Sequence, residues 1–296
     1  MVKSRYYRVA DLVFSISAEA GLFVLPDNYA PFEIPAEEAP EQLFDLRIGT
    51  IAPDVSSELL FVDTSDDDMP RIELYRVPEG SETGWLFKVS PTKESDICMH
   101  LRCSADFRQA TLEVTDEANF YFALDNATML LYAFASVRFG TLEMHASVTV
   151  KDGHGYLFLG HSGTGKSTHS RLWQEAYPDA WLLNDDNPVL RLLPNGEVRV
   201  YGSPWSGKTP CYKNLSAPVQ GLVQLHQAPE NNIRPLRLPQ AYAYMLASCS
   251  GLKIIPEMMD LLYDTIARII QAVPTYELYC LPNTDAARLC HDTLMK

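Results

Sequence analysis

Residues 156–168 have the sequence YLFLGHSGTGKST, and this stretch decides how the second half of the chain folds. Within it, Gly160–Ser167 matches the pattern G-x-x-x-x-G-K-[ST] in full. The pattern predicts a loop between an apolar strand and a helix that continues over residues 168–177. Glycines let successive backbone N–H groups surround phosphate oxygens, and the helix N-terminus adds its positive dipole end. The stretch therefore predicts an α/β fold with a phosphate-binding site.

The side chains of this loop have separate expected roles. Lys166 is expected to neutralise β- and γ-phosphate charge, and the Ser167 hydroxyl to coordinate Mg²⁺. ATP or a related nucleotide is the expected ligand, because the loop lies between a strand and a helix; a glycine-rich structural turn is the alternative. The residues expected to bind the nucleotide are Gly160, Ser162, Gly163, Thr164, Gly165, Lys166, Ser167 and Thr168.

Two adjacent aspartates follow the next apolar strand, expected at residues 181–183. Asp185 and Asp186 come 19 and 20 positions after Lys166, where a P-loop protein places a carboxylate for Mg²⁺. Neighbouring residues of a strand point to opposite faces, so the two aspartates are expected to have different roles. We assign Asp185 to magnesium, directly or through water, and Asp186 to the base that activates an attacking hydroxyl. A solvated turn is the alternative for both.

The run from Met144-His145 through the loop to Asp185-Asp186 resembles the catalytic domain of the bacterial HPr kinase/phosphorylase family. That family has a histidine at this distance before its loop, a G-x-S-G-x-G-K-S loop and a similar aspartate pair. The resemblance implies a PEP carboxykinase-related fold of mixed sheet with flanking helices, in which an antiparallel hairpin leads into the P-loop. It also implies an ATP- and Mg²⁺-dependent kinase, a homo-oligomer, and a role for His145 in polarising the transfer site. On spacing alone, His145 is expected to be a core histidine.

The resemblance covers residues 142–187 and leaves the phosphate acceptor open. Thr168 stands where the family usually has Glu, and its Glu-x-Arg-Gly-x-Gly signature is replaced by residues 202–208, GSPWSGK. The acceptor is therefore expected to be a hydroxyl of an unidentified protein, peptide or small molecule. The alternative is a regulatory protein that binds nucleotide and has lost catalysis. A PEP carboxykinase is disfavoured, because chains of that family are much longer.

The segment 202–208 is a candidate substrate loop. Trp205 offers a stacking face and Lys208 a cation for phosphate or an acidic substrate, whereas a rigid structural turn is an equal alternative. Arg234 and Arg237 could also reach phosphate, although a solvated loop is the favoured interpretation for them.

The pattern of apolar runs predicts two domains, a β-rich acidic domain over residues 1–126 and the nucleotide-binding α/β domain over residues 127–296. Lys151-Asp152-Gly153 between strands 142–150 and 156–159 is a turn signal that predicts a hairpin. Other strands are expected at 12–17, 22–25, 43–48, 59–62, 71–77, 84–89, 110–114, 198–201, 221–226 and 276–281. Helices are expected at 127–139, 240–248, 258–272 and 285–295.

The charge is unevenly placed. The 296 residues include 24 Lys and Arg against 38 Asp and Glu, a net charge of −14. Residues 1–150 hold 25 acids and 11 bases, whereas residues 151–296 hold 13 of each. Such acidity disfavours nucleic acid and anionic membrane as partners. The acidic run 63–68 lacks the spacing of a calcium loop and is expected to be a solvated loop.

Targeting and redox signals are weak. No run approaches about 20 apolar residues, so no membrane span is expected, and Asp11 and Glu19 interrupt what a signal peptide would need. The six cysteines contain no CxxC pair, which favours buried reduced thiols over disulfides or a zinc site. The sequence thus predicts a cytoplasmic protein.

Overall fold

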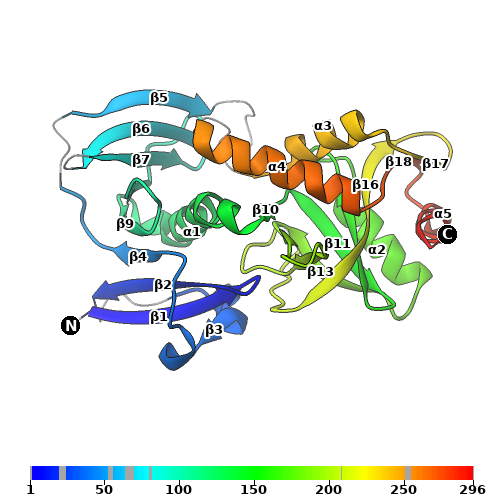
Figure 1. Cartoon of the computed structure of the whole chain (residues 1–296), viewed down its shortest axis with the longest axis horizontal. Coiled ribbons are helices and arrows are strands. Elements are labelled where there is room, and N and C mark those ends of the chain that lie inside the picture. The colour runs from blue at the N-terminus through cyan, green and yellow to red at the C-terminus, as the bar shows by residue number, and fades with distance from the viewer. Residues whose placement is uncertain are drawn as a thin grey trace. The chain divides into compact units, whose positions relative to one another are not determined.

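The computed structural model describes residues 2–19, 25–52, 56–63, 70–79, 82–207, 209–250 and 255–295 (Figure 1). The chain divides into two compact units, Met1–Ala135 and Ser136–Lys296. Each unit is built on a mixed sheet, and the fold is mixed α/β. The domain boundary predicted from the sequence, between residues 126 and 127, lies within the helix that ends the first unit.

The N-terminal unit is a nine-stranded sheet in the order β3-β1-β2-β4-β9-β8-β7-β6-β5. Strand β4 is parallel to both of its neighbours, and the remaining pairs are antiparallel. The strands are β1 (Val2–Val9), β2 (Leu12–Glu19), β3 (Glu33–Ile34), β4 (Asp45–Ile48), β5 (Glu58–Asp63), β6 (Arg71–Glu79), β7 (Glu82–Ser90), β8 (Met99–Cys103) and β9 (Gln109–Val114).

Most strands predicted in this half are confirmed. The predictions at 12–17, 43–48, 59–62, 71–77, 84–89 and 110–114 correspond to β2, β4, β5, β6, β7 and β9. The sequence pattern missed β1, β3 and β8. Residues 22–24 and 64–69 lie outside the described residues, and with them most of the predicted strand 22–25 and of the acidic run 63–68.

One helix, α1 (Phe120–Ser136), packs against this sheet and is longer than the predicted helix at 127–139. The Tyr132 hydroxyl donates to the Val9 carbonyl at 2.9 Å, and Phe134 stacks on Phe107 with ring centroids 4.7 Å apart. The helical segment Glu117–Phe139 is long and apolar enough to cross a membrane by length and composition, but 61% of its most apolar window is buried inside the protein. Such burial is what the core helix of a globular unit shows, so the chain is not an obvious membrane protein.

The C-terminal unit has a sheet in the order β10-β14-β15-β16-β12-β11-β13, and β18 pairs with β16 and β17. The strands are β10 (Thr141–Glu143), β11 (Ala146–Lys151), β12 (His154–Leu159), β13 (Trp181–Asp186), β14 (Val189–Leu192), β15 (Val198–Tyr201), β16 (Ser216–Gln227), β17 (Asn232–Pro235) and β18 (Thr275–Cys280). The predicted strands at 198–201, 221–226 and 276–281 are thus confirmed, and β14 and β17 are additions.

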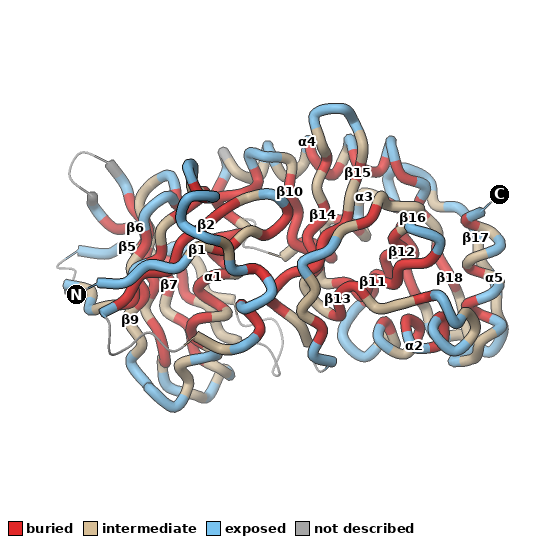
Figure 2. Tube along the Cα trace, turned by 90° about the horizontal axis from the view of Figure 1, so that it is seen from below, coloured by how far each residue is buried: buried red, intermediate tan, exposed pale blue. Residues whose placement is uncertain are grey.

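Helices cover both faces of this sheet (Figure 1). On one face α3 (Leu238–Ser248) and α4 (Pro256–Ala272) pack on Leu157 and Leu159; on the other, α2 (Lys166–Ala176) and α5 (Thr284–Leu294) pack on Tyr156 and Phe158. The alternation of β12 residues between two apolar cores explains why this strand has no polar face, and Figure 2 shows β11 and β12 buried along most of their length. The predicted helices at 240–248, 258–272 and 285–295 are confirmed.

The predicted hairpin is confirmed, with β11 and β12 antiparallel from Ala146↔Leu159 to Lys151↔His154. The strand predicted at 142–150 is, however, two strands. Strand β10 pairs with β14, whereas β11 pairs with β12 and β13. The chain changes partners at Met144 and His145, whose N–H groups donate to Pro188 and Ser248 carbonyls at 3.0 and 2.7 Å. This break puts His145 at the edge of the hairpin instead of inside a strand.

Candidate active site

The loop between β12 and α2 has the backbone of an anion site. Gly163 and Gly165 have φ of 77° and 107°, a region that residues with a Cβ rarely adopt. Helix α2 begins at Lys166 with Gly165 as its N-cap, and among the described residues no side chain caps its first N–H groups or adds a negative charge to its first turn. Four N–H donors at this end are thus available to an anion.

One contact within the loop and two from β16 hold it in place. The Thr164 hydroxyl donates to the His161 carbonyl at 2.8 Å. Gln227, at the end of β16, donates through its amide to the carbonyls of Gly163 and Thr164 at 3.2 and 3.4 Å. Ser162, Gly163 and Ser167 remain exposed at the surface of the loop, while Lys166 is buried. The loop therefore presents its small residues outward and its cation inward.

Lys166 connects the loop to the neighbouring strands. Its Nζ donates to the carbonyls of Gly160 and His161 at 3.0 and 3.3 Å, and lies 3.0 Å from His145 Nε2. Burial lowers the pKa of the Lys166 ammonium, and the carboxylates of Asp186 and Asp185 oppose this effect. A cation with three acceptors and two nearby carboxylates is well placed for a phosphate that would displace the carbonyl contacts.

His145 and Asp186 complete a contiguous set of side chains. His145 Nε2 is 3.4 Å from Asp186 Oδ1, and each side chain is 38% exposed. Burial lowers the pKa of the His145 imidazole, and the Lys166 charge adds to this, so the neutral ring accepts from the ammonium. Burial raises the pKa of Asp186, opposed by His145 and Lys166. A raised pKa makes this carboxylate a stronger base.

The two aspartates differ as the alternation of a strand requires. Strand β13 includes both, with Asp185 opposite Ser147 and Asp186 opposite Ala146 on β11. Asp185 is buried, at 5% exposure, while Asp186 faces the site. Asp186 also has φ of 141°, a strained conformation for a residue with a Cβ. Backbone strain of this kind persists only where surrounding contacts impose it, and it is common at functional positions.

Residues 202–207 impose that conformation from the other side. The Gly207 N–H donates to the Asp185 carbonyl at 2.7 Å, and Ser206 forms a bridge with Asp186. A Cβ on Gly207 would lie 3.1 Å from Asp186 Cβ and 3.2 Å from the Asp185 oxygen, so a larger residue would require these neighbours to shift. Sequence reasoning missed Gly207 as a site residue, since its role depends on a contact across 21 residues.

The described part of this stretch, 202–207, is otherwise a structural turn. Trp205 is 2% exposed, so its ring has no open face, and the stacking role expected for it is not supported. Asn184 donates through its amide to the Trp205 carbonyl at 3.0 Å and to Ser203 Oγ at 3.2 Å, which fixes the turn to β13. Lys208, the other predicted substrate residue, lies outside the described residues.

A buried acid lies behind the site. Glu143 is 4% exposed, and its Oε2 has no hydrogen-bond partner among the described residues. Burial raises the pKa of Glu143 well above its usual range, and the negative charge of Asp186 adds to this. Both effects favour the protonated form of this carboxyl group over a second buried negative charge at the site.

Magnesium fits this site only together with phosphate. Among the described residues no three His, Cys, Asp or Glu side chains converge as a metal site. Mg²⁺ in nucleotide sites is held by one or two protein oxygens, water and the substrate phosphates, so a full protein cage is not required. The exposed Ser167 hydroxyl and the Asp185 carboxylate provide two such oxygens.

The comparisons with known proteins give no family. A scan against models of protein families finds no match to this chain, and a search of curated proteins finds none either. We therefore infer the function from the geometry of the site. Of the predicted residues, the structure brings together Lys166, His145 and Asp186, with Asp185 beside them on β13.

Proposed function

We propose that the chain is a Mg²⁺-ATP-dependent phosphotransferase with an HPr kinase-like, PEP carboxykinase-related P-loop domain. The observation that carries the proposal is the contact of Lys166 Nζ with His145 Nε2 at 3.0 Å and of His145 with Asp186 at 3.4 Å. Three separate segments of the chain thus supply a cation, an imidazole and a carboxylate beside the phosphate-binding loop. The antiparallel hairpin that leads into the loop supports the proposed fold.

The phosphates of ATP are bound, in this proposal, by the loop and by α2. The open N–H groups at the start of the helix and the backbone of Gly163 and Gly165 receive the phosphate oxygens. Lys166 exchanges its carbonyl contacts for the β- and γ-phosphates. Ser167 and Asp185 would hold magnesium, which would supply positive charge to offset that of the phosphates.

Asp186 is the proposed base. As the acceptor oxygen forms its bond to the γ-phosphorus, its proton passes to the Asp186 carboxylate and the bond to the ADP oxygen breaks. Lys166 stabilises the charge that develops on the transferred group and on the departing ADP. His145 orients the Lys166 ammonium, because its neutral Nε2 accepts a hydrogen bond from Nζ, and Asp186 Oδ1 lies 3.4 Å from the same nitrogen. We place this reaction in the cytoplasm, the compartment that the sequence predicts.

Two variants of the full chain test the proposal. With labelled Mg²⁺-ATP and a lysate of the source cell, wild type is expected to label a discrete acceptor. Asp186→Asn is expected to keep ATP binding and lose transfer by about 10³-fold, since the base contributes 10²–10⁴-fold. Lys166→Ala is expected to lose transfer and to weaken binding while the fold, measured by circular dichroism, survives.

The outcomes separate the alternatives. Unchanged phosphoryl transfer in Lys166→Ala would contradict the assignment of the loop as the site that binds the ATP phosphates. Loss of ATP binding in Asp186→Asn would mean that its role is structural. Tight nucleotide binding by wild type without transfer to any acceptor would favour the regulatory protein that has lost catalysis.

A further inference from the structure

The order of the strands decides on which side of the loop a nucleoside would lie. Strand β12 lies between β11 and β16. His145 and Asp186 belong to the β11–β13 side, where the terminal phosphate would react. The opposite side is formed by β16 and β18, which run parallel to β12, so their carboxyl ends reach the same edge. Because the γ-phosphate is the end of the nucleotide, the nucleoside extends away from the acceptor side, toward β16 and β18.

A cavity of about 270 Å³ lies at that edge. It is lined by Ala228, Pro229, Glu230, Asn232, Arg234 and Tyr279. Gln227, which donates to the P-loop carbonyls, directly precedes Ala228 of the cavity wall, so consecutive residues contact the loop and line the cavity. Clefts for whole drug-sized ligands occupy about 300–1,000 Å³, so this volume suits part of a ligand.

Among the side chains that line this cavity, Arg234 is held in a defined orientation by its neighbours. Its Nε donates to Glu277 Oε1 at 2.5 Å, its Nη2 lies 3.3 Å from the Tyr279 hydroxyl, and its guanidinium lies 5.3 Å from the Tyr279 ring centroid. Yet the Arg234 side chain is 61% exposed, whereas that of Glu277 is 6% exposed. The sequence favoured a solvated loop for Arg234; the residue is instead part of β17, opposite Glu277 on β18.

The surroundings make Arg234 a stacking surface rather than a phosphate ligand. The buried Glu277 neutralises its charge, which weakens attraction to an anion. A guanidinium whose plane is fixed still stacks well on an aromatic base. His226 stacks on the Tyr279 ring at 4.7 Å and restricts its movement. Asn231 further ties the turn before β17 to the turn after β18, through Asn283 and the Leu281 N–H.

We propose that this cavity holds the nucleoside of the bound nucleotide, with a purine base stacked on the Arg234 guanidinium. The exposed amide of Asn232 and carboxylate of Glu230 offer the donors and acceptor that the edge of a purine and a ribose hydroxyl require. This inference rests on the proposed nucleotide site, and it adds a base subsite that the P-loop motif does not specify.

Tripolyphosphate separates the two claims, because it has the phosphate chain of ATP without the nucleoside. Calorimetric titration of the full chain with Mg²⁺-ATP and with Mg²⁺-tripolyphosphate is the experiment. Arg234→Lys keeps a cation for Glu277 and removes the planar stacking surface; it is expected to weaken ATP binding about tenfold and to leave tripolyphosphate within about twofold. Asn232→Ala is expected to weaken ATP binding about threefold. Arg237→Lys, a matched change outside the cavity, is expected to alter neither.

The other outcomes contradict the base subsite, the stacking role of Arg234 or the nucleotide function itself. Wild type that binds ATP no better than tripolyphosphate, or ATP affinity unchanged in both Arg234→Lys and Asn232→Ala, overturns the base subsite and leaves the nucleotide site intact. An equal loss for both ligands in Arg234→Lys overturns stacking and makes Arg234 a phosphate ligand. If wild type binds neither ligand, the proposed nucleotide function itself fails, and the subsite with it.

Discussion

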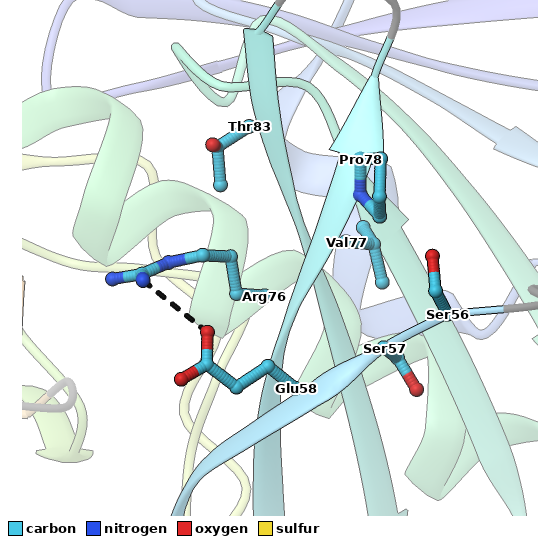
Figure 3. Close-up of a pocket in the computed structure, with 7 residues that line it drawn as sticks. All are labelled: Ser56, Ser57, Glu58, Arg76, Val77, Pro78 and Thr83. Atoms are coloured by element: carbon cyan, nitrogen blue, oxygen red, sulfur yellow. Dashed lines mark hydrogen bonds and ion pairs between the residues drawn. The ribbon is translucent and has the colours of Figure 1, made fainter.

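Arg76 in the N-terminal unit and Arg234 in the C-terminal unit each pair with a glutamate beside a cavity, yet the two pairs differ in burial. Arg76 lies 3.3 Å from Glu58, and their side chains are 50% and 65% exposed; the surrounding cavity of about 390 Å³ is shown in Figure 3. For Arg234 and Glu277 the exposures are 61% and 6%. A pair that is solvated on both sides is weakly oriented, whereas a buried carboxylate holds its partner in place. The burial of the glutamate therefore decides whether the arginine beside such a cavity is held in a fixed orientation.

Removing the two glutamates tests this difference most strongly. Glu277→Ala is expected to lower the free energy of unfolding by about 3 kcal/mol, because Arg234 and Tyr279 lose a buried charged acceptor. Glu58→Ala is expected to change it by less than about 0.5 kcal/mol, as for exposed pairs. Urea unfolding of the full chain measures both, and hydrogen exchange of peptides from β18 and β6 assigns each change to its unit. Equal effects would show that burial of the carboxylate does not distinguish the pairs.

One buried titratable group in each unit gives a second comparison, since the pKa of one is lowered and that of the other is raised. In the C-terminal unit His169 accepts from Trp173 Nε1 at 3.1 Å, and burial lowers the pKa of its imidazole to about 4. In the N-terminal unit Asp125 accepts from the Tyr29 hydroxyl at 2.8 Å, and burial raises the pKa of this carboxyl to about 6. The folded state thus binds a proton less readily than the unfolded state at His169, and more readily at Asp125.

The two groups should therefore change the stability of their units in opposite directions as the pH falls. Between pH 7 and pH 5, the unfolded chain protonates His169 and the folded chain does not, so this group should cost the C-terminal unit about 2 kcal/mol. Over the same range the folded chain protonates Asp125 first, which should add about 1 kcal/mol to the N-terminal unit. Hydrogen exchange at the two pH values measures each unit, and His169→Gln and Asp125→Asn should each remove one response. A change of the same sign from both groups would contradict the assignment.

Substitution of one glycine in each unit is expected to give the smallest difference between the units. Gly207→Ala places a methyl group 3.1 Å from Asp186 Cβ, which should displace the carboxylate and lower phosphoryl transfer about fivefold with little loss of ATP affinity. Gly49→Ala in the N-terminal unit meets only the end of the Arg47 side chain, at 3.7 Å, and should leave transfer unchanged. Initial rates with saturating ATP measure both. Full transfer by Gly207→Ala would show that the approach of this turn does not position Asp186.

The same contrast between local and distant contacts separates what could be predicted. The hairpin, the loop and helix α2 follow from glycines, a turn signal and periodicity within 25 residues, and these are confirmed. The break between β10 and β11 was missed, since apolar and polar residues alternate without interruption over 142–150 and only the choice of strand partners divides this run. The role of Gly207 and the burial of Trp205 were missed for the same reason.

By itself, the sequence determined a strand–loop–helix unit with a lysine and open helix N–H groups, because backbone freedom at glycine and apolar periodicity are local properties. It also determined that the acidic charge lies in the first half of the chain. Only the tertiary structure decided that His145 lies beside both Lys166 and Asp186, and that Glu277 fixes Arg234 across 43 residues. Those contacts depend on which strands are neighbours, and strand order is set by packing of the whole sheet rather than by any one segment.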